Sequence, residues 1–402
     1  MDFQESAELA AFRGEARSFL DQHANLRADR NAGEHPMSKA HEAHIGPARE
    51  WQRTLSDHGW AGITWPEGWG GRGLSSSHES VFLDEQAKYD VPVGPYVVAI
   101  GMVGPTLIEH GTAEQQQRFL PAMLRGEHIW CQLFSEPAAG SDLAALRTSA
   151  VRDGDEFVVN GQKVWTSGAH FSDWGILLVR TDIDAPKHRG ITYLLVDMTT
   201  PGIDIRPLEQ INRAAHFNEV FLTDVRIPVA NVVGEINGGW APTMTTLTSE
   251  RGAIGASRSV GWADIEQLAK EVGVIHDPLI RQDLARAYTR FEIMRYLRMR
   301  VQTASEHRRR PGPEAMVIKL AYSERMGEQG DLVMKMMGAE GLLFEPDAAR
   351  NAFWHHQFLS QWSSRIGGGT DQVQRNTIGE RALGLPREPR PDKDVPFRDL
   401  PK

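Results

Sequence analysis

The chain has 402 residues, of which 41% are hydrophobic and 24% charged, and this length suggests two or three domains rather than one small core. Its net charge of −9, without a strong basic stripe, argues against nucleic acid as a main partner. The single cysteine, Cys131, excludes an intrachain disulfide framework and a Cys-rich metal site, so we expect no metal.

The N-terminal residues are amphipathic and charged throughout, so they lack the apolar core of a signal peptide. No apolar run of the sequence is long enough to span a bilayer. We therefore expect a cytoplasmic protein without a membrane partner.

Residues 1–128 have the pattern of a helical N-terminal domain. Apolar residues recur at helical spacing over residues 5–23 and 46–63. Ser75 and Thr112 are suitable N-caps for two further helices.

Residues 129–238 change to strand-like runs and predict a middle antiparallel β-domain. Asn160-Gly161 lies between two β-rich runs, which predicts a hairpin turn there. Three further runs read as strands, over residues 173–182, 190–198 and 217–228.

Residues 239–402 return to helical periodicity and predict about five helices in a bundle, followed by a Pro-rich tail. One long helix is opened by Asp277-Pro278, a good N-cap and first-turn proline. The tail from Leu385 is predicted to be a surface arm. The order α, β, α without βαβ alternation argues against a Rossmann nucleotide fold.

Two segments of the β-domain carry residue types suited to ligand binding. Residues 134–148 combine Ser, Glu-Pro and Gly-Ser-Asp, and their small residues let backbone amides approach a planar or anionic ligand. A turn-rich connector explains this segment equally well. Trp165 and Ser167 share one face of an expected strand, where a planar cofactor could lie. Taken alone, Trp165 is better explained as a core residue.

Two more candidate segments lie in the C-terminal region. Glu250 and Arg251 come early on an expected helix lined with Gly and Ala, although a first-turn glutamate and a surface ion pair explain them too. Three glycines, residues 367–369, permit positive φ and precede Thr370, a natural N-cap. A helix start behind such a turn can bind an anion or a polar cofactor edge, and the alternative is a tight interhelical turn.

In this order and at these intervals, the segments resemble the acyl-CoA dehydrogenase family over nearly the whole chain. The matching pieces are "WPEGWGGRG", "HGTAEQQQRFLP", "FSEPAAGSDLAALRT", "NGQKVWTSGAHFSDW", "RGITYLLVDM", "FNEVFLTDVRIP", "GEINGGW", "SERGA" and "GGGTDQVQRNTIGERALGLP". The resemblance implies an α+β multidomain fold: an N-terminal helical domain, a middle antiparallel β-domain and a C-terminal four-helix bundle. It also implies FAD as cofactor and a CoA thioester as substrate.

The resemblance assigns flavin contacts to the β-domain. Gln132, Phe134 and Ser135 match positions at the isoalloxazine ring. Gly140 and Ser141 lie in the same flavin-lining segment, where it meets the pantetheine side of the substrate. In the next segment, Trp165 matches the residue that packs on the flavin face away from substrate, and Ser167 stands where the family usually has a threonine that reaches flavin N5.

The C-terminal matches concern the nucleotide ends of cofactor and substrate. Thr370 and Gln372 match residues that hold the adenosine half of FAD, and Arg251 matches the arginine that meets the CoA nucleotide. That half of FAD usually lies across a subunit interface, which implies a homodimer or homotetramer.

The chain departs from the family at the FAD pyrophosphate. No arginine stands at the usual place in "KEVGVIHDPLIRQDLA", since Arg281 comes a turn later, and Lys335 replaces the usual glutamine. A lysine can meet a phosphate as a point charge. Some bacterial members pair two different chains, so a heterotetramer with a paralogous subunit is an alternative.

A second departure concerns the catalytic base. Many members carry a glutamate where this chain has Gly368, which cannot take a proton. Isovaleryl-CoA and long-chain acyl-CoA dehydrogenases place the base on another helix in an "E-R" pair, which matches Glu250. The resemblance thus implies Glu250 as base, with the backbone N–H of Gly368 as a donor to the thioester oxygen.

The implied reaction is α,β-dehydrogenation of an acyl-CoA to the trans-2-enoyl-CoA, with electrons passed to an electron-transfer flavoprotein. The motifs look like members that act on branched, aromatic or polycyclic acyl groups, as in lipid or steroid catabolism. Two rival functions stay open: a non-catalytic or half-site partner subunit in a mixed oligomer, and a same-fold flavin oxidase or monooxygenase.

Overall fold

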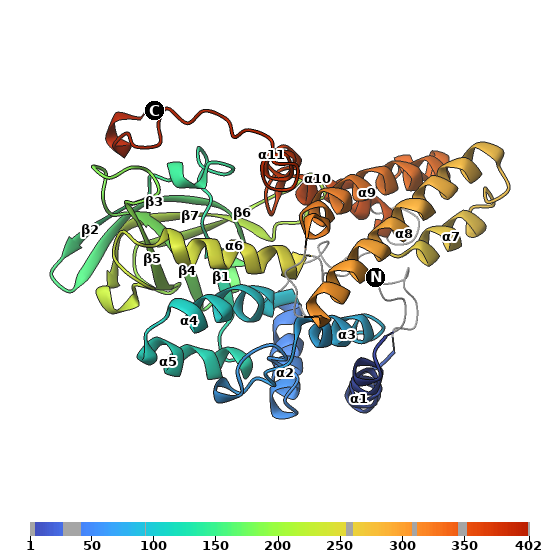
Figure 1. Cartoon of the computed structure of the whole chain (residues 1–402), viewed down its shortest axis with the longest axis horizontal. Coiled ribbons are helices and arrows are strands. Elements are labelled where there is room, and N and C mark those ends of the chain that lie inside the picture. Colours follow the sequence, from blue (N-terminus) through green and yellow to red (C-terminus); the bar gives the residue numbers. More distant parts are fainter. Residues whose placement is uncertain are drawn as a thin grey trace.

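The structure is a computed structural model that describes residues 5–26, 42–92, 94–254, 260–307, 312–344 and 352–400. Helices at the two ends of the sequence enclose one β-sheet between them in chain order (Figure 1). Figure 1 shows the sheet at one end of the molecule and the long C-terminal helices at the other, with the N-terminal helices beneath both. This is the three-part architecture expected from the sequence.

The N-terminal part is helical, and of its two predicted caps Thr112 is confirmed, whereas Ser75 occupies the N-cap position without a capping hydrogen bond from its side chain. Its α-helices are α1 (Ala7–His23), α2 (Glu42–Asp57), α3 (Ser76–Gln86), α4 (Gly104–His110) and α5 (Ala113–Leu124). Thr112 caps α5 in a full capping box with Gln115, and Ser75 stands at the N-cap of α3.

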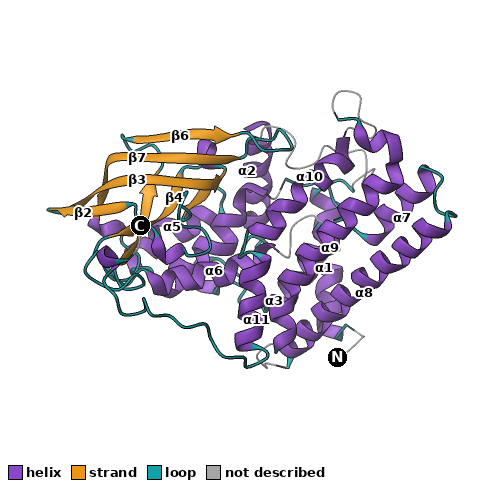
Figure 2. Cartoon of the chain, turned by 90° about the horizontal axis from the view of Figure 1, so that it is seen from above, coloured by secondary structure: helices purple, strands orange, loops and turns teal. Residues whose placement is uncertain are grey.

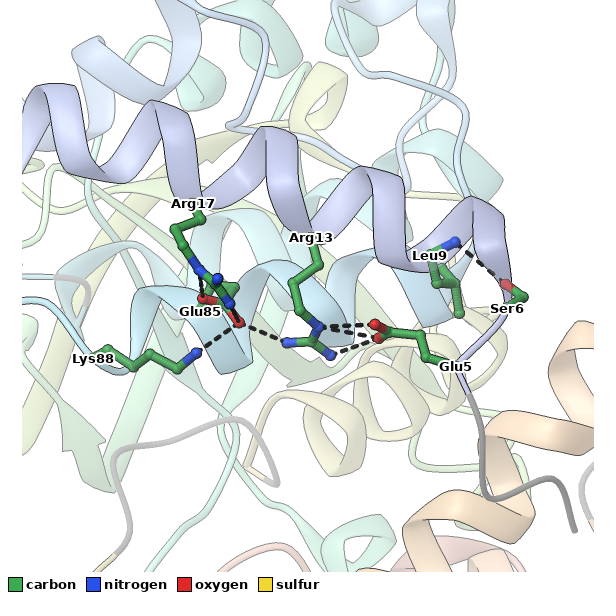
Figure 3. Close-up of polar contacts among 7 residues, drawn as sticks. All are labelled: Glu5, Ser6, Leu9, Arg13, Arg17, Glu85 and Lys88. Carbon is green, nitrogen blue, oxygen red and sulfur yellow. Dashed lines mark hydrogen bonds and ion pairs between the residues drawn. The ribbon is translucent and has the colours of Figure 1, made fainter.

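A buried carboxylate fastens α1 to α3. Glu85 of α3 accepts from Arg13 at 2.8 Å, from Arg17 at 3.2 Å and from Lys88 at 2.7 Å (Figure 3). Its side chain is 1% exposed, so the three cations surround a charge that water does not reach. Burial alone would raise the pKa of Glu85, but hydrogen bonds from Lys88, Arg13 and Arg17 outweigh burial and lower it to about 2.

The middle part is a seven-stranded sheet. The strands are β1 (Trp130–Leu133), β2 (Ser149–Asp153), β3 (Glu156–Ser167), β4 (Trp174–Arg180), β5 (Ile191–Asp197), β6 (Ile203–Leu208) and β7 (Phe217–Pro228). Their order is β1-β4-β2-β3-β7-β6, with β5 on β4. Figure 2 shows β6, β7, β3 and β2 following one another across the sheet. Most pairs are antiparallel as expected, but β4 runs parallel to both β1 and β2.

The predicted hairpin turn at Asn160-Gly161 is wrong. Both residues lie inside β3, where Asn160 pairs with Ser149, and the turn between β2 and β3 is at Gly154-Asp155 instead. A register shift between Val159 and Gly161 marks a bulge against β7. The preceding Asp153-Gly154 is itself a strong hairpin dipeptide, and Gly154 takes the positive φ of 63°.

The described residues of the C-terminal part form six α-helices, where about five were expected. They are α6 (Trp240–Ile254), α7 (Trp262–Glu271), α8 (Pro278–Glu306), α9 (Pro313–Met337), α10 (Phe353–Ile366) and α11 (Asp371–Arg381). Asp277 caps α8 as predicted, accepting from the amides of Leu279 and Ile280. Helix α9 packs against α8, α10 and α11 and is the centre of this bundle. Among the helices that the structure describes, none has the length and apolar character needed to cross a membrane.

Candidate functional site

Helix α6 brings Glu250 to the sheet. The Glu250 carboxylate lies 3.5 Å from Nε2 of Gln132 on β1, at the long end of hydrogen-bond distances. One turn earlier, Thr246 is buried, and its hydroxyl lies 2.8 Å from that of Thr106 and 3.1 Å from that of Tyr193. Residues four apart share a helix face, so the face of α6 that carries Glu250 is the one that Thr246 holds against α4 and β5.

The place of Glu250 in its helix differs from the expectation. Glu250 was expected early on a helix, and the alternative to a role as base was a first-turn glutamate that favours the helix N-terminus. It lies in the C-terminal part of α6 (Trp240–Ile254), so that structural role is wrong. The side chain of Arg251 lies outside the part of the chain that the structure describes.

A buried ion pair fastens the segment after β1 to β3. Nζ of Lys163 donates to the carbonyl oxygen of Phe134 at 3.1 Å and to the Glu136 carboxylate at 2.9 Å. The Val164 amide donates to the Ser135 carbonyl at 2.9 Å. The side chain of Lys163 is fully buried, and burial, opposed by Glu136, lowers its pKa to about 8. Gln132, Phe134 and Ser135 are thereby held beside the strand that carries Trp165.

Trp165 and Ser167 lie on one exposed face of β3, as predicted, with buried Thr166 between them. The Trp165 side chain is 59% exposed, so the core explanation for it is wrong. Its φ is 61°, a conformation that bulky residues rarely adopt and that costs free energy. Phe217 meets the indole edge-on, with ring centroids 5.8 Å apart. Packing in the chain does not explain this strained, exposed ring, and a flat ligand stacked on it would.

Gly140 and Ser141 lie on an exposed turn after the Phe134 segment. The next residue, Asp142, pairs with Lys187 at 2.9 Å. The turn is therefore tied to the loop between β4 and β5 rather than to the sheet core.

The three glycines form a turn between α10 and α11 whose carbonyls are tied down. Gly368 and Gly369 have positive φ, 63° and 88°, as expected. The Gly368 carbonyl accepts from Nε2 of Gln374 at 2.9 Å, and the Gly369 carbonyl accepts from Nζ of Lys319 at 2.6 Å. Within the described residues, the Gly368 N–H donates to no other group. These two bonds hold the backbone on the C-terminal side of Gly368, and its N–H remains available as a donor.

Helix α11 begins as predicted. The hydroxyl of Thr370 accepts from the Val373 amide at 3.2 Å, which makes Thr370 its N-cap, and Gln372 is exposed on the first turn. The hydrogen bonds of the described residues at this turn run to α9, α10 and α11, and none of them joins Thr370 or Gln372 to Glu250.

Sequence reasoning missed the charged residues that support these segments. Asp371 is buried behind the glycine turn, accepts from Ser323 and from Arg365, and lies 3.7 Å from Lys319. Lys163 was also missed. It follows Phe157, Val159 and Gly161 at strand alternation, and a lysine at such an inward position signals a paired buried charge.

Lys335 and Arg281, the two residues discussed for the FAD pyrophosphate, differ in whether they already have a partner among the described residues. Lys335 forms an ion pair with Asp283 of α8 at 2.7 Å, so it already has a partner within the chain. Arg281 is exposed and lines a hollow of about 240 Å³ between α7 and α8 with Trp262 and Tyr288.

Comparison with known proteins identifies the family. The N-terminal, middle and C-terminal domain models of acyl-CoA dehydrogenases match residues 6–127, 131–225 and 237–383. Acyl-CoA dehydrogenase IpdE1 of Mycobacterium tuberculosis is 39% identical over 392 residues, which cover 95% of this chain and 99% of that protein.

Solved structures agree with this match. A structure titled "Tcur3481-Tcur3483 steroid ACAD" superposes with a TM-score of 0.81 at 34% identity, covering 96% of this chain and 100% of that chain. The ChsE4-ChsE5 complex from Mycobacterium tuberculosis gives a TM-score of 0.77 at 31% identity, with the same two coverages. The chain therefore belongs to the acyl-CoA dehydrogenase family of flavoprotein oxidoreductases.

Proposed function

We propose that this protein dehydrogenates the Cα–Cβ bond of an acyl-CoA thioester with FAD as cofactor and Glu250 as catalytic base. The observation that carries the proposal is the approach of the Glu250 carboxylate to Gln132, on the strand that leads into Phe134 and Ser135. A base and a cofactor-lining segment then share one site, while Gly368 has no side chain to compete for the α-proton.

Two groups of the chain act on the substrate in this proposal. Glu250 removes the α-proton, and the Gly368 N–H donates to the thioester oxygen, where negative charge develops. One such donor contributes about 3–4 kcal/mol in comparable oxyanion sites. Losing the glutamate side chain at position 368 therefore does not lose the donor. FAD, when bound, supplies the acceptor for the β-hydrogen, which leaves as hydride.

The residues present fit a flavin. The exposed indole of Trp165 offers a stacking surface, and the hydroxyl of Ser167 lies on the same face of β3. Phe134 and Ser135 are fixed beside that strand by Lys163 and Val164. At the far end of the cofactor, Thr370 and Gln372 at the start of α11 would meet the adenosine half.

The substrate class follows from the relatives and the glycine turn. A solved relative carries "steroid ACAD" in its title, and residues 367 and 368 place no side chain at the reacting end. We propose a bulky, polycyclic acyl group on CoA, with Ser141 and Arg251 on the CoA side. An electron-transfer flavoprotein would take the electrons onward.

A second candidate is a half-site subunit in a mixed oligomer. Lys335 is engaged by Asp283 and no arginine stands at the usual pyrophosphate position, which favours a site completed by another chain. The two solved relatives named above carry two protein names in their titles, which supports the same arrangement.

The visible spectrum of the purified chain separates the two candidates. We expect a yellow protein whose flavin bleaches anaerobically with one member of a panel running from straight-chain to steroid-like acyl-CoAs. A colourless, stable oligomer that takes up no added FAD would contradict the main proposal and support the half-site subunit. Rapid oxygen consumption without transfer to a ferricenium dye would indicate an oxidase instead.

A further inference from the structure

The C-terminal tail does more than form a surface arm. After α11, residues 385–391 are exposed, and the chain then reaches the far end of the sheet (Figure 1). Pro396 forms a β-bridge with Pro186 in the loop between β4 and β5. The amides of Phe397 and Arg398 donate to the carbonyls of Ala185 and Ile183, each at 3.0 Å. The tail is thus bound to that loop by main-chain hydrogen bonds.

A buried arginine joins the tail to the Gly140–Ser141 turn. The ring of Phe397, 9% exposed, lies 3.9 Å from the guanidinium carbon of Arg180, which is 3% exposed. The same guanidinium donates to the Ala144 carbonyl at 2.6 Å and to the Lys187 carbonyl at 2.8 Å. Arg180 therefore contacts three segments at once: the tail, the β4–β5 loop and the residues just after Ser141.

Lys187 makes a second link between the same segments. Its Nζ lies 2.9 Å from the Asp142 carboxylate and 3.1 Å from the Asp392 carboxylate. The Lys187 side chain is 16% exposed, so water screens these pairs less than it would on an open surface. Asp142 directly follows Ser141, and the tail therefore acts one residue away from a proposed substrate contact.

Apart from Arg180 at the end of β4, these contacts go to loops rather than to the apolar core of the sheet. Phe397 is outside both apolar clusters that pack on the sheet, so the tail is not needed to complete either of them. What it adds is a link to residues 140–142, an exposed turn that directly precedes the buried residues Leu143 and Ala144.

We infer that residues 392–399 form a clamp that orders the Gly140–Asp142 turn for binding the CoA arm of the substrate. This rests on the proposed function, because that function places Ser141 at the pantetheine. The tail residues are positioning residues: they act on the substrate through Asp142, Ala144 and Lys187. Their loss should weaken CoA binding and leave the flavin and the chemical step in place.

The test compares Asp392→Asn/Phe397→Ala with a matched control, Asp394→Asn, in the full-length protein. Asp394 is exposed in the same tail. Within the described residues, its side chain forms no hydrogen bond and no ion pair. Hydrogen exchange of the amides in residues 140–146 needs no ligand. Calorimetric titration with coenzyme A then measures the affinity.

In the double variant we expect the amide exchange rates of residues 140–146 and the Kd for coenzyme A both to rise by about three- to thirtyfold. This is the scale of a cation–π contact and a partly exposed ion pair lost together. The control should match the wild type, and FAD content should not change.

Unchanged exchange in the double variant overturns the clamp. Raised exchange with unchanged CoA affinity overturns its role in substrate binding. A wild type that binds no coenzyme A contradicts the proposed function instead, and the exchange comparison still decides whether the tail orders the turn.

Discussion

Glu250 and Gln132 lie within 3.5 Å of each other although 118 residues separate them in the sequence. The contact joins the C-terminal part of α6 to the strand that begins the proposed flavin-lining segment. A carboxylate that is partly buried needs polar partners, and the Gln132 amide is one that comes from the proposed site itself.

Gln132→Ala tests this contact. Removing a donor to a charged acceptor costs about 1.5–3 kcal/mol at good geometry, and the 3.5 Å separation puts the expected loss at the lower end. We expect flavin reduction by substrate to slow about tenfold when it is measured with FAD at saturation, since Gln132 also matches a flavin contact. Gln132→Glu should be worse, because it sets two carboxylates side by side. Stopped-flow absorbance measures both, and a wild-type rate in Gln132→Ala would show that the contact has no catalytic role.

Trp165→Ala tests the exposed indole. Since the side chain is 59% exposed, the free energy of unfolding of the apoprotein should change by no more than about 0.5 kcal/mol, as for an ordinary surface residue. FAD affinity should fall markedly, and Trp165→Phe should retain part of it because a smaller ring still stacks. Flavin retained after dialysis measures the affinity. Equal retention in the Ala variant and the wild type would contradict a flavin on this face.

Asp371→Ala tests the support of the glycine turn. Burial raises the pKa of Asp371, but hydrogen bonds from Ser323 and Arg365 and the charge of Lys319 outweigh burial and lower it. Removing the carboxylate leaves Lys319 buried without its counter-charge. We expect the free energy of unfolding to fall by about 2–3 kcal/mol, below the cost for a fully buried pair because Arg365 is partly exposed. Urea unfolding measures this, and Asp371→Asn should lose less because it keeps a polar contact with Ser323.

Glu85→Gln tests the pH dependence of the α1–α3 junction. The folded-state pKa of about 2 lies below the ordinary value of 4.5, so the ionised Glu85 stabilises the fold above pH 4.5. That contribution falls progressively as pH drops from about 4.5 to about 2, because in this window the unfolded chain binds the proton and the folded state does not. The wild type should lose stability between pH 5 and pH 3 more steeply than Glu85→Gln. Thermal unfolding measures this at each pH. An equal fall of Tm with pH in the two proteins would contradict the ion cluster of Figure 3.

Local signals in the sequence predicted the helices well and the sheet less well. Thr112 and Asp277 are correct caps because capping depends on neighbouring residues only. The turn at Asn160-Gly161 was wrong because Asp153-Gly154 offers an equally good dipeptide, and pairing of Asn160 with Ser149 decides between them. The parallel pairing of β4 with β1 depends on a crossover that no local pattern reveals.

In the candidate site too, the features set by local sequence could be predicted, and the contacts between distant segments could not. The shared face of Trp165 and Ser167 follows from strand alternation, and the positive φ of Gly368 follows from residue type. The approach of Glu250 to Gln132, the support of Phe134 by Lys163 and the return of the tail to Arg180 are contacts between distant segments. Such contacts depend on the whole chain's packing, which the sequence patterns of single elements do not contain.

The central claim is that Glu250 takes the α-proton, and Glu250→Gln tests it most directly. The variant keeps the size and the polar contacts of the side chain but removes the base. The control is Glu266→Gln, which alters a partly exposed glutamate paired with Lys270 on α7. With FAD bound and acyl-CoA at saturation, anaerobic flavin reduction should be slower in Glu250→Gln by about 10²–10⁴-fold, the factor that a general base typically contributes. The control should reduce its flavin at the wild-type rate. Reduction of Glu250→Gln at the wild-type rate would contradict the account.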